Sequence, residues 1–317
     1  MYEALKELDS VTLNFSREGF LVLNIILAII MFGVALEIKV GHFQLLAKEK
    51  KSTITGFISQ FLLLPFITFL VVIILNKFIT PTVAMGMILV ACCPGGNISN
   101  FISALAKGNA ALSVTLTAIA TLSAVILTPL NFSIWGSLYL KVMSSFAPVE
   151  LLQELEIHPF EMFKTVLLIM AIPLLTGMLV NHYLPGITKA IFKPIRILSI
   201  ILFFGIVAAL LQKNINSFLE YIHLIFFIVL IHNALGLGTG YLFASAVRCN
   251  DKNRRTISIE TGIQNSGLAL VLLFNPDIFP KELQIGGMAF IAAWWGIWHI
   301  LSGLGIAFWW SRKPVTG

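Results

Sequence analysis

The sequence predicts an all-α polytopic membrane protein with nine transmembrane helices. Hydrophobic residues make up 58% of the 317 residues and charged residues only 11%, whereas a soluble domain carries about 25% charged residues. Apolar windows of about 20 residues, the length at which a helix spans a bilayer, recur along the chain. These windows cover residues 20–38, 53–76, 82–106, 110–138, 161–181, 195–212, 217–246, 254–276 and 283–310.

The loops between these windows carry unequal numbers of basic residues. Fourteen Lys and Arg lie on the side that holds the C-terminus, in residues 39–52, 182–196 and 247–255, at Lys107 and after residue 311, and seven lie on the other side. Cytoplasmic loops carry the excess of Lys and Arg. We therefore expect an outside N-terminus and a cytoplasmic C-terminus, in the plasma membrane or the inner membrane of a bacterium. The net charge of +6 is then a topology signal, and we expect no nucleic-acid partner.

Two polar stretches interrupt apolar windows, Cys92–Asn100 in the third window and Glu260–Gly267 in the eighth. Gly and Pro end helices there, and unpaired backbone survives at membrane depth only where protein buries it or it lines a wet cavity. The third and eighth windows cross the membrane in opposite directions. Interrupted helices in matching positions of two inverted halves indicate the binding site of a secondary transporter. We therefore predict an inverted repeat with two broken helices.

Glu260 is an acidic residue well inside an apolar window, and no basic residue follows Arg255 in that stretch. An unpaired carboxylate at such depth costs roughly 2.5–3.5 kcal/mol on insertion scales. A bound cation or a proton is the expected partner. The alternative is a Glu at a helix end that faces cytoplasmic water near Arg254 and Arg255.

Oxygen-bearing side chains are expected at the depth of Glu260, and hard cations such as sodium prefer oxygen ligands. Ser113 and Thr117 are four residues apart and share one helical face, and Gln264 lies one turn after Glu260. A single Ser or Thr is usually a packing residue between membrane helices, but the whole set together with Glu260 favours ion binding. Its members are Gln60, Ser99, Asn100, Ser113, Thr117 and Gln264.

The motifs at Cys92–Asn100, Lys107–Ser113 and Glu260–Ala269 resemble those of the bile acid:sodium symporter family, and the resemblance runs from Ile30 to Gly303. It implies a single transporter domain over residues 1–317, in which the two broken helices cross each other. Within it, a panel would be formed by residues 20–38 and 161–212, and a core by residues 53–138 and 217–310.

The resemblance also implies two sodium sites that share Glu260. The first would comprise Ser99, Asn100, Ser113, Thr117 and Glu260, and the second Gln60, Glu260, Thr261, Ile263 and Gln264. Because the N-termini of broken helices attract negative charge, we expect an anionic substrate near Asn97, Asn265 and His299. Asn97 and Ile300 stand where some relatives carry Thr and Asn, so the resemblance does not identify bile acid as the substrate.

The predicted function is sodium-coupled secondary active symport of an organic anion by alternating access, with two Na⁺ per substrate. The anion would be bile-acid-like, a steroid sulfate or a small carboxylate. Na⁺ is the coupling ion, no other cofactor is expected, and the expected partners are the substrate and membrane lipid, with no obligate protein partner. No nucleotide-binding loop, zinc pair or nucleophile elbow is present in the sequence, so no enzyme activity is expected. The alternatives are a passive channel or facilitator and a metalloid or other anion exporter that uses Cys92 or Cys93.

Overall fold

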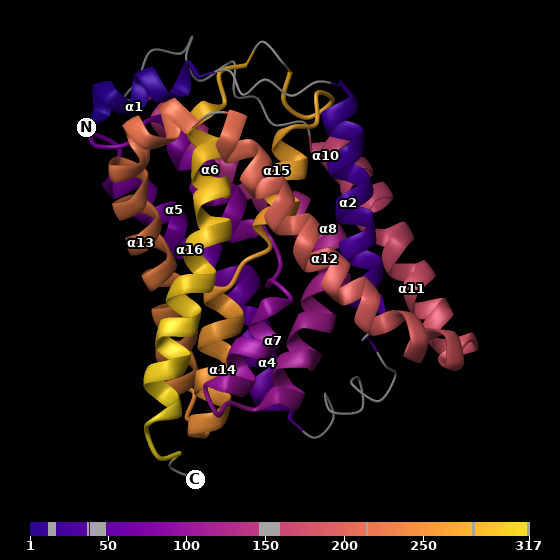
Figure 1. Cartoon of the computed structure of the whole chain (residues 1–317). Coiled ribbons are helices and arrows are strands. Elements are labelled where there is room, and N and C mark those ends of the chain that lie inside the picture. The colour runs from indigo at the N-terminus through magenta and orange to yellow at the C-terminus, as the bar shows by residue number, and fades with distance from the viewer. Residues whose placement is uncertain are drawn as a thin grey trace.

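The computed structural model describes residues 1–11, 17–36, 38, 49–145, 159–213, 215–280 and 283–315. Over these residues the chain is helical, and the β structure within them is an isolated bridge between Gly95 and Gln264. The elements, seen in Figure 1, are α1 (Tyr2–Asp9), α2 (Arg17–Ala35), α4 (Lys50–Ile58), η1 (Ser59–Leu63), α5 (Leu64–Ile74), α6 (Pro81–Cys92), α7 (Ile98–Leu105), α8 (Ala110–Met143), α10 (Pro159–Val166), η2 (Leu167–Ala171), α11 (Ile172–Tyr183), α12 (Pro185–Lys213), α13 (Ile215–Ala246), α14 (Asp251–Gly262), α15 (Ser266–Leu273) and α16 (Gly286–Ser311).

Each of the nine predicted windows contains a helix or a succession of helices in the described part of the chain. Five helical segments there are long and apolar enough to cross a bilayer: Lys50–Ile74, Ala110–Met143, Pro159–Tyr183, Leu219–Ala246 and Gly286–Ser311. Asn24–Ala35 and Pro81–Cys92 are shorter apolar helices. The chain is therefore an all-α, multi-pass membrane protein, and its two termini lie at opposite ends of the bundle (Figure 1).

Local sequence accounts for where several of these helices begin. The side chains of Asn109, Asn250 and Asn265 cap α8, α14 and α15 by accepting hydrogen bonds from backbone N–H groups at 2.9–3.1 Å. Such caps satisfy donors that a helix leaves unpaired at its first turn. The π-helical turns η1 and η2 are each followed by a proline, Pro65 and Pro173, which cannot donate a backbone hydrogen bond within the helix.

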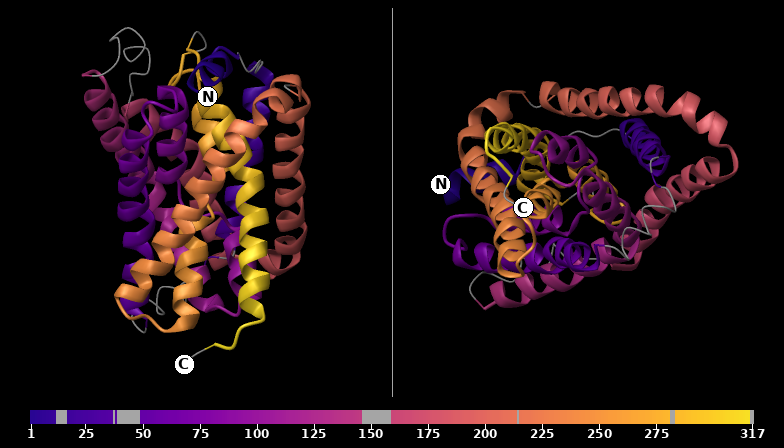
Figure 2. Two further views of the ribbon diagram at one scale, coloured as in Figure 1. Left: turned by 90° about the vertical axis from the view of Figure 1, so that its left-hand side faces the viewer. Right: turned by 90° about the horizontal axis from the view of Figure 1, so that it is seen from below.

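The helices form two groups that meet around the helix breaks. α2 packs against α11 and α12, and this group lies along one side of the bundle (Figure 2). On the other side, α6, α7, α14 and α15 pack against α8, α13 and α16. The short helix α1 lies across the end of this second group, with Leu5 and Leu8 fully buried.

Candidate ion and substrate site

The two predicted breaks cross each other inside the bundle. The helix α6 ends at Cys92 and α7 begins at Ile98, while α14 ends at Gly262 and α15 begins at Ser266. The Gly96 N–H donates to the carbonyl of Ile263 at 2.8 Å, and the Asn265 N–H donates to the carbonyl of Pro94 at 2.8 Å. Each break thus supplies hydrogen-bond partners for backbone groups that the other leaves unpaired, as burial in an apolar environment requires.

Two glycines allow the breaks to approach this closely. A Cβ atom on Gly95 would lie 3.3 Å from the carbonyl oxygen of Glu260 and 3.4 Å from its Oε2 atom. A Cβ atom on Gly96 would lie 3.0 Å from the carbonyl oxygen of Gln264. The distances to the two carbonyl oxygens are shorter than an ordinary van der Waals contact, so a side chain at either glycine would require the facing backbone to shift.

The first predicted ligand set comes together around Glu260. This residue is only 4% exposed. Its Oε1 atom accepts hydrogen bonds from Ser99 at 2.7 Å and from Ser113, and its Oε2 atom accepts one from Thr117 at 2.9 Å. Ser113 and Thr117 also lie within hydrogen-bond distance of the Asn100 Oδ1 atom, at 3.0 and 3.1 Å. All five residues of the set therefore meet in one cluster.

This cluster holds more acceptor oxygens than protons to donate. Ser113 and Thr117 each carry one hydroxyl proton but each faces both the Glu260 carboxylate and the Asn100 carbonyl. Among the described residues no Lys or Arg forms an ion pair with Glu260, and the nearby Arg255 pairs with Asp251 at 2.8 Å. A negative site rich in oxygen lone pairs suits a hard cation, and it does not match the alternative of a helix end in cytoplasmic water.

The second predicted set is assembled around two paired amides. The Gln60 Nε2 atom, from η1, donates to the Gln264 Oε1 atom at 2.8 Å and to the carbonyl of Cys93 at 2.9 Å. The Gln264 Nε2 atom donates to the carbonyl of Thr261 at 2.6 Å. The sequence suggested that Gln264 lies one helical turn after Glu260. Because α14 ends at Gly262, Gln264 instead lies in the break itself. The carboxylate of Glu260 makes its hydrogen bonds in the first set, and the Ile263 carbonyl faces Gly96.

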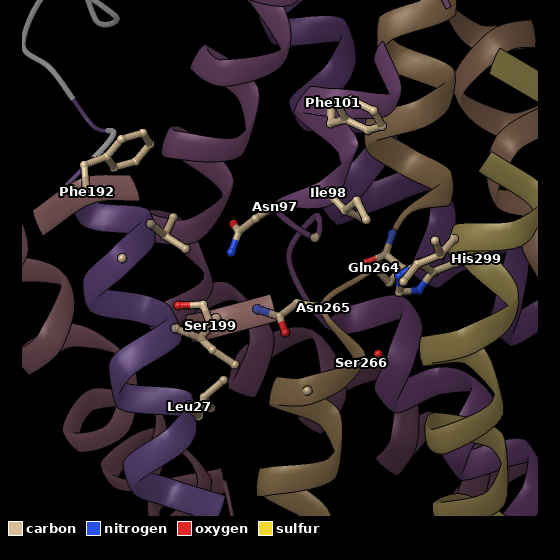
Figure 3. Close-up of a pocket in the computed structure, with 16 residues that line it drawn as sticks. Leu27, Asn97, Ile98, Phe101, Phe192, Ser199, Gln264, Asn265, Ser266 and His299 are labelled. Atoms are coloured by element: carbon tan, nitrogen blue, oxygen red, sulfur yellow. The ribbon is translucent and has the colours of Figure 1, made fainter. Parts of the chain in front are cut away.

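A cavity of about 420 Å³ lies beside the crossing, between α2, α12 and the second group of helices. Asn97, Asn265 and His299, the three predicted substrate residues, all line it (Figure 3). The remaining lining residues are Leu27, Ile30, Gly33, Val34, Gly96, Ile98, Phe101, Phe192, Ser199, Gln264, Ser266, Gly267 and Ile300, none of which is charged.

Sequence reasoning missed two hydroxyl residues of this wall, Ser199 and Ser266. The Ser266 Oγ atom and the His299 Nδ1 atom are buried and have no hydrogen-bond partner within the described residues. Ser266 sits in the polar stretch that marks the second break, so its position could have been inferred. Ser199 lies in an apolar helix with no such signal, and only the packing of α12 brings it to the cavity.

Comparison with known proteins agrees with this geometry. The sequence pattern of the Sodium Bile acid symporter family matches residues 24–221, more than half of the chain. The chain belongs to the sodium bile acid symporter family. The resemblance inferred from the motifs is therefore confirmed.

Several curated proteins are similar to the chain over most of its length. An uncharacterized sodium-dependent transporter of Bacillus subtilis, YocS, is 33% identical over 92% of this chain and 83% of its own length. An Arabidopsis thaliana relative, named "Probable sodium/metabolite cotransporter BASS1, chloroplastic", is 31% identical over 78% of this chain and 57% of its own length. The human ileal sodium/bile acid cotransporter is 27% identical over 87% of this chain and 78% of its own length.

Proposed function

We propose that this protein is a sodium-coupled symporter that carries a small organic anion, with two Na⁺ transported per anion. The observation that carries this proposal is the buried carboxylate of Glu260, which is surrounded by hydroxyl and amide oxygens, has no basic partner in the described chain, and lies at the crossing of two helix breaks. The similarity to proteins named sodium-dependent transporter and sodium cotransporter supports the choice of ion.

The first Na⁺ would bind between Glu260, Ser99, Asn100, Ser113 and Thr117. In this arrangement the hydroxyl protons turn away and the hydroxyl lone pairs face the ion. Ser113 and Thr117 have two protons to share among the oxygens of Asn100 and Glu260, so some of these oxygens receive no hydrogen bond and can bind the ion. The charge of the cation offsets the cost of holding a carboxylate at this depth.

The second Na⁺ would bind the side-chain oxygens of Gln60 and Gln264, the carbonyls of Thr261 and Ile263, and Glu260. Four of these residues lie at the end of α14 or in the second break, and Gln60 lies on η1. Gln60 also donates to the Cys93 carbonyl at the first break, so an ion among them would hold η1 and the second break together beside the first. The carboxylate and the Ile263 carbonyl both lie close to Gly95, since a Cβ atom there would lie 3.4 Å from the Glu260 Oε2 atom and 3.7 Å from that carbonyl oxygen. One carboxylate could thereby contribute to both ions.

The anion would bind in the cavity with its charged group between the N-termini of α7 and α15. Helix N-termini present unpaired N–H groups and a positive dipole end. Asn97 makes no side-chain capping bond to α7, so its amide is available to a ligand. Ser266 and His299 add buried polar atoms without partners. The apolar walls, including Leu27, would contact the rest of the substrate.

We further propose nine spans divided into a panel, residues 20–38 and 161–212, and a core, residues 53–138 and 217–310. The cavity between α2 and α12 on one side and the breaks on the other supports this division. Rocking of the core against the panel would expose the cavity alternately to an outside that holds the N-terminus and to the cytoplasm. Entry of one net positive charge at 100 mV supplies about 2.3 kcal/mol, enough for a ~50-fold gradient.

The alternative roles receive less support from this geometry. Cys92 and Cys93, the proposed residues of a metalloid exporter, are fully buried and neither lines the cavity. A passive facilitator would equilibrate its substrate without accumulating it. The deciding experiment is uptake into proteoliposomes, with an anion first selected by a thermal-shift screen of bile acids, steroid sulfates and 2-oxo acids in NaCl and KCl. We expect the anion to accumulate above its equilibrium concentration only under an inward Na⁺ gradient. Equal uptake in NaCl and KCl would contradict the proposal.

A further inference from the structure

The second break is held from the side by α13, a helix that contributes no residue to either proposed ion site or to the proposed substrate residues. Helix α13 approaches α14 so closely that a Cβ atom on Gly240 would lie 2.6 Å from the carbonyl oxygen of Ile257. One turn nearer the break, a Cβ atom on Gly236 would lie 3.4 Å from the carbonyl oxygen of Thr261. The Ser258 hydroxyl donates to the carbonyl of Leu237 at 2.7 Å. The last two turns of α14 are therefore fixed against this face of α13.

Asn233 completes this face at the level of the break. Its side chain is 1% exposed, and its Nδ2 atom donates to the carbonyl of Gly262 at 2.7 Å. Gly262 is the last residue of α14 and lies between Thr261 and Ile263, whose carbonyls are the proposed backbone ligands of the second Na⁺. A hydrogen bond to the Gly262 carbonyl therefore fixes the rotation of the two peptide groups on either side.

The other end of the Asn233 amide is bound to α16. The Ser302 hydroxyl donates to the Asn233 Oδ1 atom at 2.5 Å and also lies 3.2 Å from the carbonyl of His299. His299 and Ile300, which line the cavity, lie in the turn just before Ser302. A continuous path of hydrogen bonds thus runs from the end of α14, through Asn233, to the part of α16 that forms the cavity wall.

We propose that Asn233 is a positioning residue that couples Na⁺ binding at the second break to the shape of the substrate cavity, with Ser302 as its link to α16. This inference rests on the proposed function. The amide suits this role because its nitrogen donates to the Gly262 carbonyl while its oxygen accepts from the Ser302 hydroxyl. When Na⁺ draws the Thr261 and Ile263 carbonyls inward, the Gly262 carbonyl turns with them, and Asn233 transmits the turn to Ser302.

A cysteine reporter in the cavity tests the coupling without a known substrate. In an Ile300→Cys background, the rate of reaction with a charged methanethiosulfonate reagent is measured while NaCl replaces KCl at constant ionic strength. Na⁺ binding is measured separately, as the rise in thermal midpoint of the same purified protein. We expect Na⁺ to change the labelling rate in the reporter background. Adding Ser302→Ala or Asn233→Asp should reduce that change at least about fivefold, the lower end of usual coupling factors, while stabilisation by Na⁺ persists.

The matched control is Thr68→Val in the same background. The Thr68 Oγ1 atom lies 2.8 Å from the Nε2 atom of His232, the neighbour of Asn233 on α13. This variant therefore also removes one buried hydrogen bond to α13, but it leaves the path to Ser302 intact. It should retain the Na⁺ response of the labelling rate. If Ser302→Ala behaves like Thr68→Val, or if the reporter alone does not respond to Na⁺ that stabilises it, the coupling role is wrong. Absence of stabilisation by Na⁺ in the wild-type protein would instead contradict the proposed function.

Discussion

Gly95 and Gln264 face each other in an antiparallel backbone bridge that joins the two helix breaks. The bridge places a residue with no side chain against the carboxylate of Glu260, and it places the amide of Gln264 within reach of Gln60. Both proposed ion sites therefore depend on a single backbone crossing. Any change that separates the breaks should affect both ions at once, whereas a change to one side chain should affect one site more than the other.

Replacing Glu260 by Ala should abolish Na⁺-dependent transport and Na⁺-dependent stabilisation. The carboxylate is the charged group in both proposed sites, and neutral oxygens alone would not hold the ions. In KCl the variant should be as stable as the wild-type protein or more so, because a buried unpaired charge is removed. The measurement is the thermal midpoint in NaCl and KCl, followed by uptake. Glu161→Ala is the control, since Glu161 forms a solvent-accessible ion pair with Lys164 at 3.3 Å. A Glu260→Ala variant that still accumulates anion with Na⁺ would disprove the two-ion scheme.

The Gln60→Ala and Ser113→Ala variants should weaken different sodium sites. Gln60 belongs to the paired amides and Ser113 to the hydroxyls around Glu260. Each variant should lower the apparent Na⁺ affinity, and the Hill coefficient of Na⁺ activation should fall from near two toward one. Loss of the buried hydrogen bonds should lower the unfolding free energy by only about 0.5–1.5 kcal/mol. Unchanged Na⁺ titration curves in both variants would contradict the residue assignment.

A methyl group at Gly96 should disturb the crossing, whereas one at Gly238 should not. On Gly96 the added carbon would lie 3.0 Å from the Gln264 carbonyl oxygen, but on Gly238, in α13, it would meet nothing within 4 Å. We expect Gly96→Ala to lower the unfolding free energy by about 1–3 kcal/mol, as overpacking does, and to reduce Na⁺ affinity. Gly238→Ala should be neutral or stabilising by up to about 1 kcal/mol. Equal Na⁺ titrations for the two alanine variants would show that the crossing does not shape the sites.

Stability should depend on pH through Asp9, at the end of α1 and outside the spans. The side chain is 7% exposed and accepts hydrogen bonds from Thr80 at 3.2 Å and from Thr82. Burial raises the pKa of Asp9 to about 6, while hydrogen bonds from Thr82, Thr80 and the Gly287 backbone oppose the shift. The folded protein therefore binds this proton more tightly than the unfolded chain does. The unfolding free energy should rise as pH falls from about 7 toward 4, by at most about 3 kcal/mol.

The Asp9→Asn variant should lose this pH dependence. The thermal midpoint, measured between pH 4 and 7.5 at constant salt, should change less with pH than that of the wild-type protein. Glu3→Gln serves as the control, because it removes an exposed carboxyl from the same helix. If Asp9→Asn and Glu3→Gln give the same profile as the wild-type protein, Asp9 does not titrate in this range.

The sequence predicts those parts of the site that depend on local spacing. Ser113 and Thr117, four residues apart on one helix, both bind Glu260. Pro94 in the first polar stretch and Gly262 in the second likewise locate the ends of α6 and α14. Local spacing is visible in a single sequence because a helix fixes which residues share a face.

Contacts between distant segments could not be predicted in the same way. The pairing of Gln60 with Gln264 depends on how η1 packs against the breaks, and the bond from Asn233 to Gly262 depends on the closeness of α13 and α14. The π-helical turn that holds Gln60 had only one signal in the sequence, Pro65. The buried position of Asp9 had none, because an acidic residue near the N-terminus usually faces water.

Variants of the cavity wall should weaken anion binding without weakening Na⁺ binding. Asn265 both caps α15, through a hydrogen bond from Leu268 N–H at 3.0 Å, and lines the cavity, so Asn265→Ala would mix two effects. Asn265→Asp keeps the capping oxygen, removes the amide donor and adds a negative charge that repels an anion. Loss of a hydrogen bond to a charged group costs about 1.5–3 kcal/mol, or roughly 10- to 150-fold in affinity.

Three variants separate these contributions for any anion found in the uptake screen. Asn265→Asp should weaken anion binding most, because it adds repulsion. Asn97→Ala and His299→Ala should each weaken it less, because each removes a polar group from the cavity wall without adding a negative charge. In all three, the rise in thermal midpoint caused by NaCl without anion should equal that of the wild-type protein, because none of the three residues touches Glu260. Wild-type anion affinity in Asn265→Asp would mean that the charged group does not bind at the N-terminus of α15. Wild-type affinity in all three variants would place the substrate outside this cavity altogether.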